Sequence, residues 1–335
     1  MSQHTLAHLR ANDRASLYEL KPEPSSSLRA FVVSTPESRL ICNDPFITGL
    51  RYTELLRTAV REALILLHET KAFDAVESDT VVLHILRGGL NFGIREALGE
   101  AFGWNDHSSA FISAQRARVS RGSDDWIITE NAYRKLSLNR HTSIVFGDVV
   151  ATGTSLKYGL HEVVEAAHEQ HKDIRDLTFF TIGGTRSHEL VRELEDGALK
   201  ESKNYTHSTV VYFEGVFEVA GSDSPLTLRI PGTDLLRSKA TLAPEFIESQ
   251  YEQPSYPLER CTIYDAGSRA FQAPEYRKDV QDYWTRMLEL ARRGRDFASL
   301  LSERFPELDP SRFGEVSLEQ ICQQQLEKFL PKRKG

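Results

Sequence analysis

Apolar residues recur at helical spacing between residues 52 and 70, and they would lie on one face of a helix. These positions are Leu55, Leu56, Ala59, Val60, Ala63, Leu64 and Leu67. The pattern predicts an amphipathic helix, with Thr53 as its N-cap. Similar patterns predict further helices from Leu90 to about Phe102, over residues 156–171, and over residues 187–194 with Ser187 as cap.

Unbroken apolar runs separate these helical segments. They cover residues 28–33, 80–86, 110–114, 142–150, 177–183 and 208–213. Runs without polar alternation are typical of strands that are buried on both faces of a parallel sheet. Because strands and helices alternate from about residue 52 to 213, the sequence predicts an α/β fold with a doubly wound, mostly parallel sheet.

The segments outside this alternation have a different character. Residues 1–27 predict a poorly defined arm, residues 214–261 are irregular and rich in proline, and residues 261–270 predict a short strand that enters a tight turn. Residues 276–305 have an amphipathic helical pattern that Gly294 interrupts. We therefore expect an N-terminal arm that contributes to a hood (1–47), an α/β core (48–220), an irregular hood over the core (221–275) and a C-terminal helical extension (276–335).

Composition narrows the class of protein. The chain has 335 residues, 40% of them apolar and 27% charged, which is ordinary for a globular protein. A net charge of −7 argues against a general nucleic-acid binder. Cys42, Cys261 and Cys322 are too far apart in the sequence to suggest a zinc site or a disulfide framework. The polar N-terminus and the lack of an 18-residue apolar run predict a cytoplasmic protein without a membrane span.

The most informative stretch is residues 142–155. A buried strand is followed by the carboxylate of Asp148, then by the small and hydroxyl residues Ala151, Thr152, Gly153, Thr154 and Ser155, and then by a helix. The N–H groups of such a loop and the dipole of the helix favour an anion, and the hydroxyls add further donors. A ribose 5-phosphate fits this combination of a phosphate-sized loop and a nearby carboxylate.

A second loop of this kind follows residues 80–86, where Arg87, Gly88 and Gly89 separate a strand from a helix. His84, within the strand, is interpreted as a core histidine. Residues 115–131 predict a hairpin that carries Arg116, Arg118 and Arg121. By itself this hairpin fits either a solvated surface element or a cationic loop at a binding site.

Three separated pieces resemble one family. The run I-V-F-G-D-V-V-A-T-G-T-S (144–155) resembles the 5-phosphoribosyl-1-pyrophosphate (PRPP) motif of type I phosphoribosyltransferases. The run I-L-R-G-G-L (85–90) is similar to the pyrophosphate loop of that family, and Y-D-A-G-S-R (264–269) is similar to a segment of uracil phosphoribosyltransferases. The resemblance covers about residues 48–213 and the short stretch near residue 265.

The resemblance implies a role for each matching residue. Ala151, Thr152, Gly153, Thr154 and Ser155 would hold the 5-phosphate, and Asp148 would bind ribose hydroxyls. Arg87, Gly88 and Gly89 would hold pyrophosphate. Arg116 would belong to a loop that closes over PRPP. Asp265 would hold Mg²⁺-pyrophosphate through water, and with Ala266 and Gly267 it would form the base-binding segment.

The resemblance also implies an activity and its partners. The activity is Mg²⁺-dependent transfer of a phosphoribosyl group from PRPP to a uracil-like pyrimidine or a related heterocycle, with release of pyrophosphate, in a homodimer that binds neither nucleic acid nor membrane. The sequence departs from the family at Gly147, where the motif has a first acid, and at Tyr264 and Ser268. Two alternatives therefore stay open: a non-catalytic regulator that binds PRPP or a nucleotide, and a specialised relative that cleaves nucleotides.

Overall fold

A computed structural model of the chain describes residues 4–21, 27–86, 88–118, 126–202, 204–229, 233–264 and 272–330. Its centre is a ten-stranded sheet with six adjacent parallel strands. In spatial order these are β3 (Leu28–Ser34), β11 (His207–Val219), β10 (Asp173–Gly184), β9 (His141–Val150), β4 (Thr80–Leu86) and β5 (Ser108–Ser113). The prediction of an α/β fold with a mostly parallel sheet is confirmed.

Antiparallel strands complete the sheet. β2 (Ser16–Lys21) and β1 (Thr5–Ala11) extend it beyond β3, and β8 (Arg134–Lys135) pairs with β5. β12 (Leu235–Leu242) pairs with the last residues of β11. A separate two-stranded ribbon consists of β6 (Gln115–Arg118) and β7 (Trp126–Glu130), as the predicted hairpin requires.

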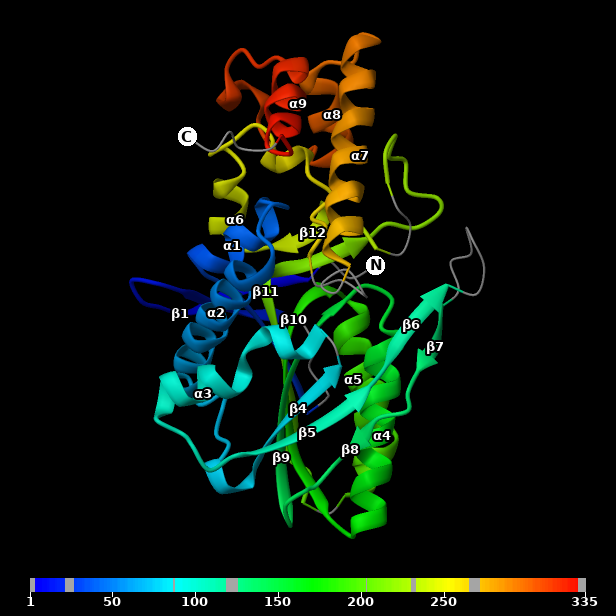
Figure 1. Cartoon of the computed structure of the whole chain (residues 1–335). Coiled ribbons are helices and arrows are strands. Elements are labelled where there is room, and N and C mark those ends of the chain that lie inside the picture. The colour runs from blue at the N-terminus through cyan, green and yellow to red at the C-terminus, as the bar shows by residue number, and fades with distance from the viewer. Residues whose placement is uncertain are drawn as a thin grey trace, which may run out of the picture.

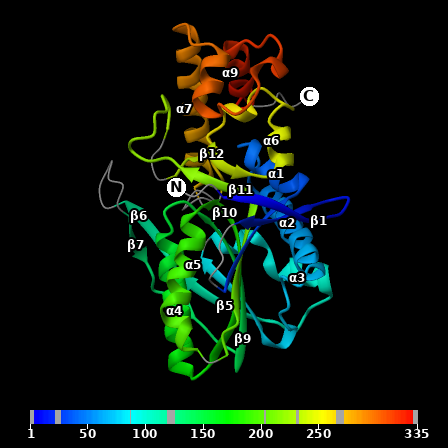
Figure 2. The same cartoon turned by 180° about the vertical axis from the view of Figure 1, so that it is seen from behind.

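Helices cover both faces of the parallel strands (Figures 1 and 2). α2 (Gly49–Glu69) and α3 (Ile94–Phe102) lie on one side, and α4 (Thr154–Gln170) and α5 (Arg186–Asp196) lie on the other. The strands between them are buried almost throughout, and Phe146 of β9 stacks on Phe179 of β10 with their centroids 4.4 Å apart. This burial explains why the strand segments of the sequence lack polar alternation.

The remaining helices gather at the end of the sheet where the parallel strands finish (Figure 1). They are α1 (Pro36–Asn43), α6 (Pro244–Ser249), α7 (Ala273–Arg292), α8 (Phe297–Arg304) and α9 (Leu318–Glu327). α7 and α8 are separate helices, so Gly294 interrupts the pattern as predicted. The described part of the chain contains five single-turn 3₁₀ segments: η1 (Glu77–Asp79), η2 (Gly88–Phe92), η3 (Ala198–Glu201), η4 (Tyr256–Leu258) and η6 (Pro310–Phe313). Within the described ranges, no helix is both long and apolar enough to cross a membrane.

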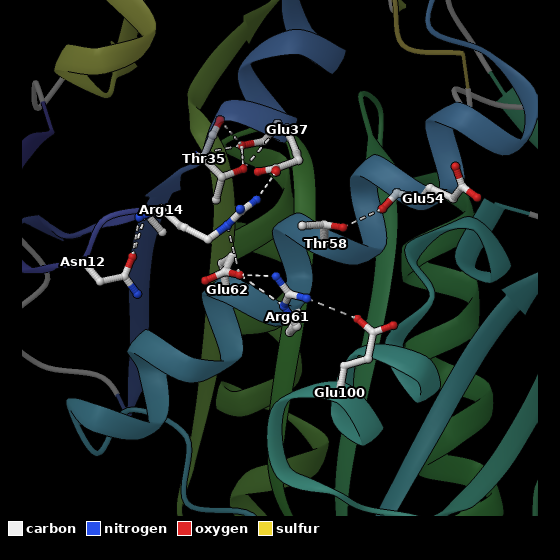
Figure 3. A network of polar contacts seen from close by, with 11 residues as sticks. Asn12, Arg14, Thr35, Glu37, Glu54, Thr58, Arg61, Glu62 and Glu100 are labelled. Carbon is white, nitrogen blue, oxygen red and sulfur yellow. Dashed lines mark hydrogen bonds and ion pairs between the residues drawn. The ribbon is translucent and has the colours of Figure 1, made fainter.

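The N-terminal residues are better ordered than the sequence predicts. Instead of a poorly defined arm, residues 5–21 form the hairpin of β1 and β2. Its turn is fixed by Arg14, which contacts Glu37 of α1 and lies 3.4 Å from the carboxylate of Glu62 in α2 (Figure 3). Glu62 also accepts a hydrogen bond of 3.1 Å from Arg61, which reaches Glu100 of α3 at 3.7 Å. Long-range ion pairs of this kind cannot be read from local sequence patterns.

Several predicted boundaries are also corrected. α2 begins after Thr48, so Thr53 lies inside the helix and is not its cap. α5 is preceded by Thr185 and not capped by Ser187, and α3 begins at Ile94 because residues 88–92 form η2 first. Residues 261–264 are not a strand, and residues 265–271 lie outside the described part of the chain. The irregular segment 214–261 contains the continuation of β11 together with β12 and α6.

Candidate functional site

Asp148 lies near the carboxyl end of β9, between two parallel neighbours. It pairs in register with Thr181 of β10, and β4 flanks the other side of the strand. Its side chain is half-buried, and Oδ1 accepts a hydrogen bond of 2.9 Å from the N–H of Val149. In open α/β sheets, ligands bind beyond the carboxyl ends of the strands, which is where this carboxylate lies.

Residues 151–153 connect β9 to α4. Gly153 is the N-cap of α4 and has a left-handed backbone conformation with φ of 77°, which glycine adopts without steric cost. The first N–H groups of the helix have no acceptor within the helix, and they face the loop together with the positive end of the helix dipole. The hydroxyls of Thr152 and Thr154 lie 3.4 Å apart beside them. This loop can therefore hold an oxyanion.

Ser155 has a structural contact that the sequence does not reveal. Its hydroxyl donates a hydrogen bond of 2.7 Å to the carbonyl oxygen of Ala114, directly after β5. This bond fastens the first turn of α4 to the neighbouring loop and leaves the backbone N–H of Ser155 as the group that can face an anion. Thr152 and Thr154 are then the hydroxyl residues of the loop that suit a phosphate.

The Arg-Gly-Gly loop lies directly against this strand. Gly88 and Gly89 begin η2, which packs on β9, and both are buried. A Cβ atom built on Gly89 would lie 3.1 Å from the carbonyl oxygen of Gly147, the residue before Asp148. The Gly88–Gly89 turn, which is far from residue 147 in the sequence, therefore lies against β9 next to Asp148. Arg87 lies outside the described residues.

Phe92, at the end of η2, explains why residue 147 is glycine. A Cβ atom on Gly147 would lie only 2.3 Å from Cγ of Phe92, whose ring is fully buried. The ring thus occupies the space into which the first acid of the family motif would project. Sequence inspection identifies Gly147 as unusual but misses Phe92, since only the fold brings the two together.

α2 connects η2 to Tyr264, the first residue of the run (264–269) that is similar to uracil phosphoribosyltransferases. Thr53 donates a hydrogen bond of 3.3 Å to Oδ1 of Asn91 in η2. The adjacent Tyr52 packs edge-on against Tyr264, with ring centroids 5.6 Å apart. Tyr264 also contacts the ring of Tyr276 at 5.3 Å. The chain is therefore fixed at Tyr264, where the proposed base-binding segment begins.

Other predicted site residues are less completely described. Asp265, Ala266 and Gly267 lie outside the described residues. Arg116 belongs to β6, opposite Ile128 of β7. The ribbon of β6 and β7 runs beside α4 (Figure 1).

His84 occupies the core behind the Gly-Gly turn. It is buried and stacks on Phe111 with ring centroids 4.9 Å apart. Burial, together with the nearby charge of Arg95, lowers the pKa of its imidazole. Its environment fits the interpretation of a core histidine.

Arg186 of α5 borders the phosphate-sized loop and was not singled out from the sequence. Its Cγ would lie 3.1 Å from a Cβ atom on Gly153, and Cδ1 of Leu190 would lie 2.5 Å from the same point. The Arg186 guanidinium contacts Glu193 at 2.8 Å and Glu189 at 3.3 Å. α5 thus forms one wall of the loop.

No protein-family model and no curated protein sequence matches the chain. Solved structures that match include adenine phosphoribosyltransferases from Leishmania donovani (14% identity, 57% of this chain and 86% of that one, TM-score 0.32) and from Trypanosoma brucei (14%, 62% and 87%, TM-score 0.35). A hypoxanthine phosphoribosyltransferase from Staphylococcus aureus matches at 18% identity over 58% of this chain and 89% of that one, with a TM-score of 0.26. At such low TM-scores, the likeness carries no argument about the activity of this chain.

Proposed function

We propose that the protein transfers a 5-phosphoribosyl group from PRPP to a nucleobase and releases pyrophosphate. One observation carries the proposal. The Gly88–Gly89 turn after β4 packs on β9 beside Asp148, and α2 joins that turn to Tyr264 through Thr53 and Tyr52. Described residues from each of the three pieces, namely Asp148, Gly89 and Tyr264, are thereby connected through β9, η2 and α2.

The proposed reaction exchanges one bond at the anomeric carbon of the ribose. The bond from this carbon to a pyrophosphate oxygen breaks, and a ring nitrogen of the base forms the new bond from the opposite face as its proton passes to the departing pyrophosphate. The N–H groups of residues 151–155 would hold the 5-phosphate, and Asp148 would accept hydrogen bonds from ribose hydroxyls. Arg87 and the N–H groups of Gly88 and Gly89 would stabilise the charge that develops on pyrophosphate.

A divalent cation fits this site if it is held by one carboxylate together with the phosphates of the substrate. Mg²⁺ is typically bound through one or two carboxylates together with substrate phosphates and water. Asp148 offers such a carboxylate beside the loop, whereas the described residues contain no cluster of three or more ligating side chains. We therefore propose Mg²⁺ that enters with the pyrophosphate of PRPP, held also by Asp265 through water. When bound, it would supply positive charge that favours departure of pyrophosphate.

The acceptor proposed is a uracil-like pyrimidine or a related heterocycle, read by residues 265–267. The resemblance of residues 264–269 to uracil phosphoribosyltransferases supports this choice. We also propose a homodimer, which sedimentation of the purified protein would test. A sedimenting species of monomer mass at assay concentration would contradict it.

A pyrophosphate-release assay tests the activity directly. The full-length protein would be mixed with PRPP, Mg²⁺ and a panel of pyrimidine and purine bases. We expect release with at least one base, and we expect Asp148→Asn to abolish it without lowering the melting temperature substantially. Asp196→Asn, at the exposed end of α5, is the matched control and should release pyrophosphate at the wild-type rate. Unchanged turnover in Asp148→Asn would rule out the ribose-binding role.

Arg116→Ala tests closure of the β6–β7 ribbon. If Arg116 acts when the ribbon closes over PRPP, its loss should lower kcat much more than it weakens the binding of ribose 5-phosphate. An equal effect on both quantities would contradict a closing role.

Phe92 supports a second candidate function, a regulator that binds PRPP or a nucleotide without turnover. The ring fills the place of one carboxylate and leaves Asp148 as the acid at the end of β9. Binding through the loop would survive this loss better than catalysis. PRPP that raises the melting temperature, with no pyrophosphate release from any base, would favour this candidate over the enzyme.

A further inference from the structure

The C-terminal helices enclose an unusual group of buried cations. Arg237, Arg260 and Arg304 are 3%, 5% and 5% exposed. Backbone carbonyls bind two of them: Arg237 donates to Glu259 at 2.5 Å and to Cys42 at 3.1 Å, and Arg304 donates to Leu228 at 2.5 Å. Burial of a guanidinium is costly unless its N–H groups are satisfied, so these contacts are needed.

Arg260 is satisfied much less well. Its Nη1 lies 3.9 Å from Oδ1 of Asp234, which is beyond hydrogen-bonding distance. Its guanidinium lies over the ring of Tyr283, 4.9 Å from the centroid. Nη2 is buried and has no hydrogen-bond partner among the residues that the structure describes. Burial of a guanidinium with so few acceptors is costly, and a nearby anion would offset that cost.

A cavity of about 110 Å³ lies at this guanidinium. Two further arginines, Arg229 and Arg286, line it together with Asp279 and Asp282 of α7. Arg229 is held in place by a hydrogen bond of 2.9 Å to the carbonyl oxygen of Ser224. Pockets for drug-sized ligands measure roughly 300–1,000 Å³, so this cavity suits a small ion and not a whole nucleotide.

The charges around the cavity favour an anion. Three arginines and two aspartates line the cavity, and a guanidinium fork matches the oxygens of phosphate in bidentate geometry. We propose that Arg260, Arg286 and Arg229 form a binding site for a small tetrahedral oxyanion of the inorganic phosphate class. The negative charge of phosphate would offset the positive charge of these guanidinium groups.

The proposed phosphate site lies close in the sequence to the proposed base-binding residues 265–267. Arg260 lies four residues before Tyr264, whose ring packs on Tyr52 of α2. A bound anion would therefore fix the segment that leads to residues 265–267. The site itself does not depend on the proposed transfer reaction, because none of its residues belongs to the β9 or β4 loops.

Phosphate-dependent stabilisation of the full-length protein tests the site. The melting temperature is followed as inorganic phosphate replaces chloride at constant ionic strength, since a ligand that binds only the folded state raises it. We expect saturable stabilisation, weakened about tenfold in apparent affinity by Arg286→Gln, because one charge-assisted hydrogen bond is lost. Arg293→Gln, which removes an exposed charge at the end of the same helix, should behave as the wild type.

Two further variants separate a site from general charge effects. Arg260→Lys keeps the buried charge but loses the fork, and it should remove the saturable response. Asp282→Asn removes a repelling carboxylate and should strengthen phosphate binding. Equal phosphate responses in the wild type, Arg260→Lys and Arg286→Gln would overturn the proposal, as would weaker binding in Asp282→Asn. Stabilisation by PRPP, measured in the same variants, reports separately on the loop after β9.

Discussion

The ring of Phe92 lies over the Cα atom of Gly147 so closely that no side chain fits at residue 147. A Cβ atom there would be 2.3 Å from Cγ and 2.8 Å from Cβ of Phe92. Because this contact docks η2 on β9, it fixes the distance between the Gly88–Gly89 turn and Asp148. The buried ring of Phe92 therefore fits only because residue 147 has no side chain.

A double-mutant cycle tests this coupling. Gly147→Asp should destabilise the protein by about 1–3 kcal/mol through overpacking, and Phe92→Ala by about 3–5 kcal/mol through loss of a buried ring. Together they should cost at least about 1 kcal/mol less than the sum, because the truncated residue 92 leaves room for the aspartate. The free energy of unfolding in urea measures all three.

The matched control combines Gly147→Asp with Phe217→Ala. Phe217 is also fully buried, but it belongs to β11 and packs on Phe246. The effects of this pair should add. Additivity in the Phe92 pair as well would contradict direct contact between residues 92 and 147.

Gly153→Ala should destabilise the phosphate-sized loop in two ways, by backbone strain and by a steric collision. At φ of 77°, an alanine costs about 1–2 kcal/mol, and the collision with Leu190 at 2.5 Å adds about 1–3 kcal/mol. Gly103→Ala is a close control, since Gly103 has φ of 74° and no atom within 4 Å of the built Cβ. Urea unfolding should show the larger loss for Gly153→Ala, and stabilisation by PRPP should be lost in that variant alone. Equal losses in both would exclude the role of Leu190.

Glu62→Gln should weaken the attachment of the N-terminal hairpin. The carboxylate of Glu62 is buried and serves both Arg14 and Arg61, so its neutralisation should cost about 1–3 kcal/mol of unfolding free energy (Figure 3). Glu100→Gln, whose side chain is 37% exposed, should cost less than about 1 kcal/mol. Thermal unfolding of both variants measures the difference, and a larger cost for Glu100→Gln would contradict this order.

Two buried acids should make stability fall as pH rises towards neutrality. Burial raises the pKa of Glu214 to about 7 and that of Glu259 to about 7, from 4.5. The folded state therefore binds more protons than the unfolded state between these values, so each acid's stabilising contribution is complete below pH 4.5 and is lost as pH rises through 7. For one such acid, the contribution is on the order of 3 kcal/mol.

Glu259→Gln should flatten this dependence. Trp284 donates a hydrogen bond of 2.9 Å to Oε1 of Glu259, and the amide oxygen of glutamine accepts it equally. Urea unfolding at several pH values between about 5 and 8 measures the slope. Glu248→Gln serves as control, because the ordinary pKa of a glutamate is already below this range and hydrogen bonding to Arg312 lowers the pKa of the exposed Glu248 carboxyl further. An unchanged slope in Glu259→Gln would contradict the raised pKa.

Local pattern was sufficient for most of the core elements. The continuous apolar runs placed β4 and β9 within one residue of their observed bounds, because strands buried on both faces carry no polar alternation. The order of small, hydroxyl and glycine residues after Asp148 likewise located the turn and the start of α4. These features depend on neighbours in the sequence, so the sequence by itself determined them.

Tertiary structure decided what surrounds those elements. Phe92 over Gly147, Ser155 on Ala114 and Arg14 on Glu62 each join residues distant in the chain, and no periodicity reports such contacts. The strands β1 and β2 were missed because β1 is mostly exposed and β2 is short, and the two become a hairpin only when β3 offers an edge. A carboxylate and a phosphate-sized loop at the end of a strand thus follow from the sequence alone. Only the packing shows why residue 147 is glycine, since the ring of Phe92 fills the space that a side chain there would need.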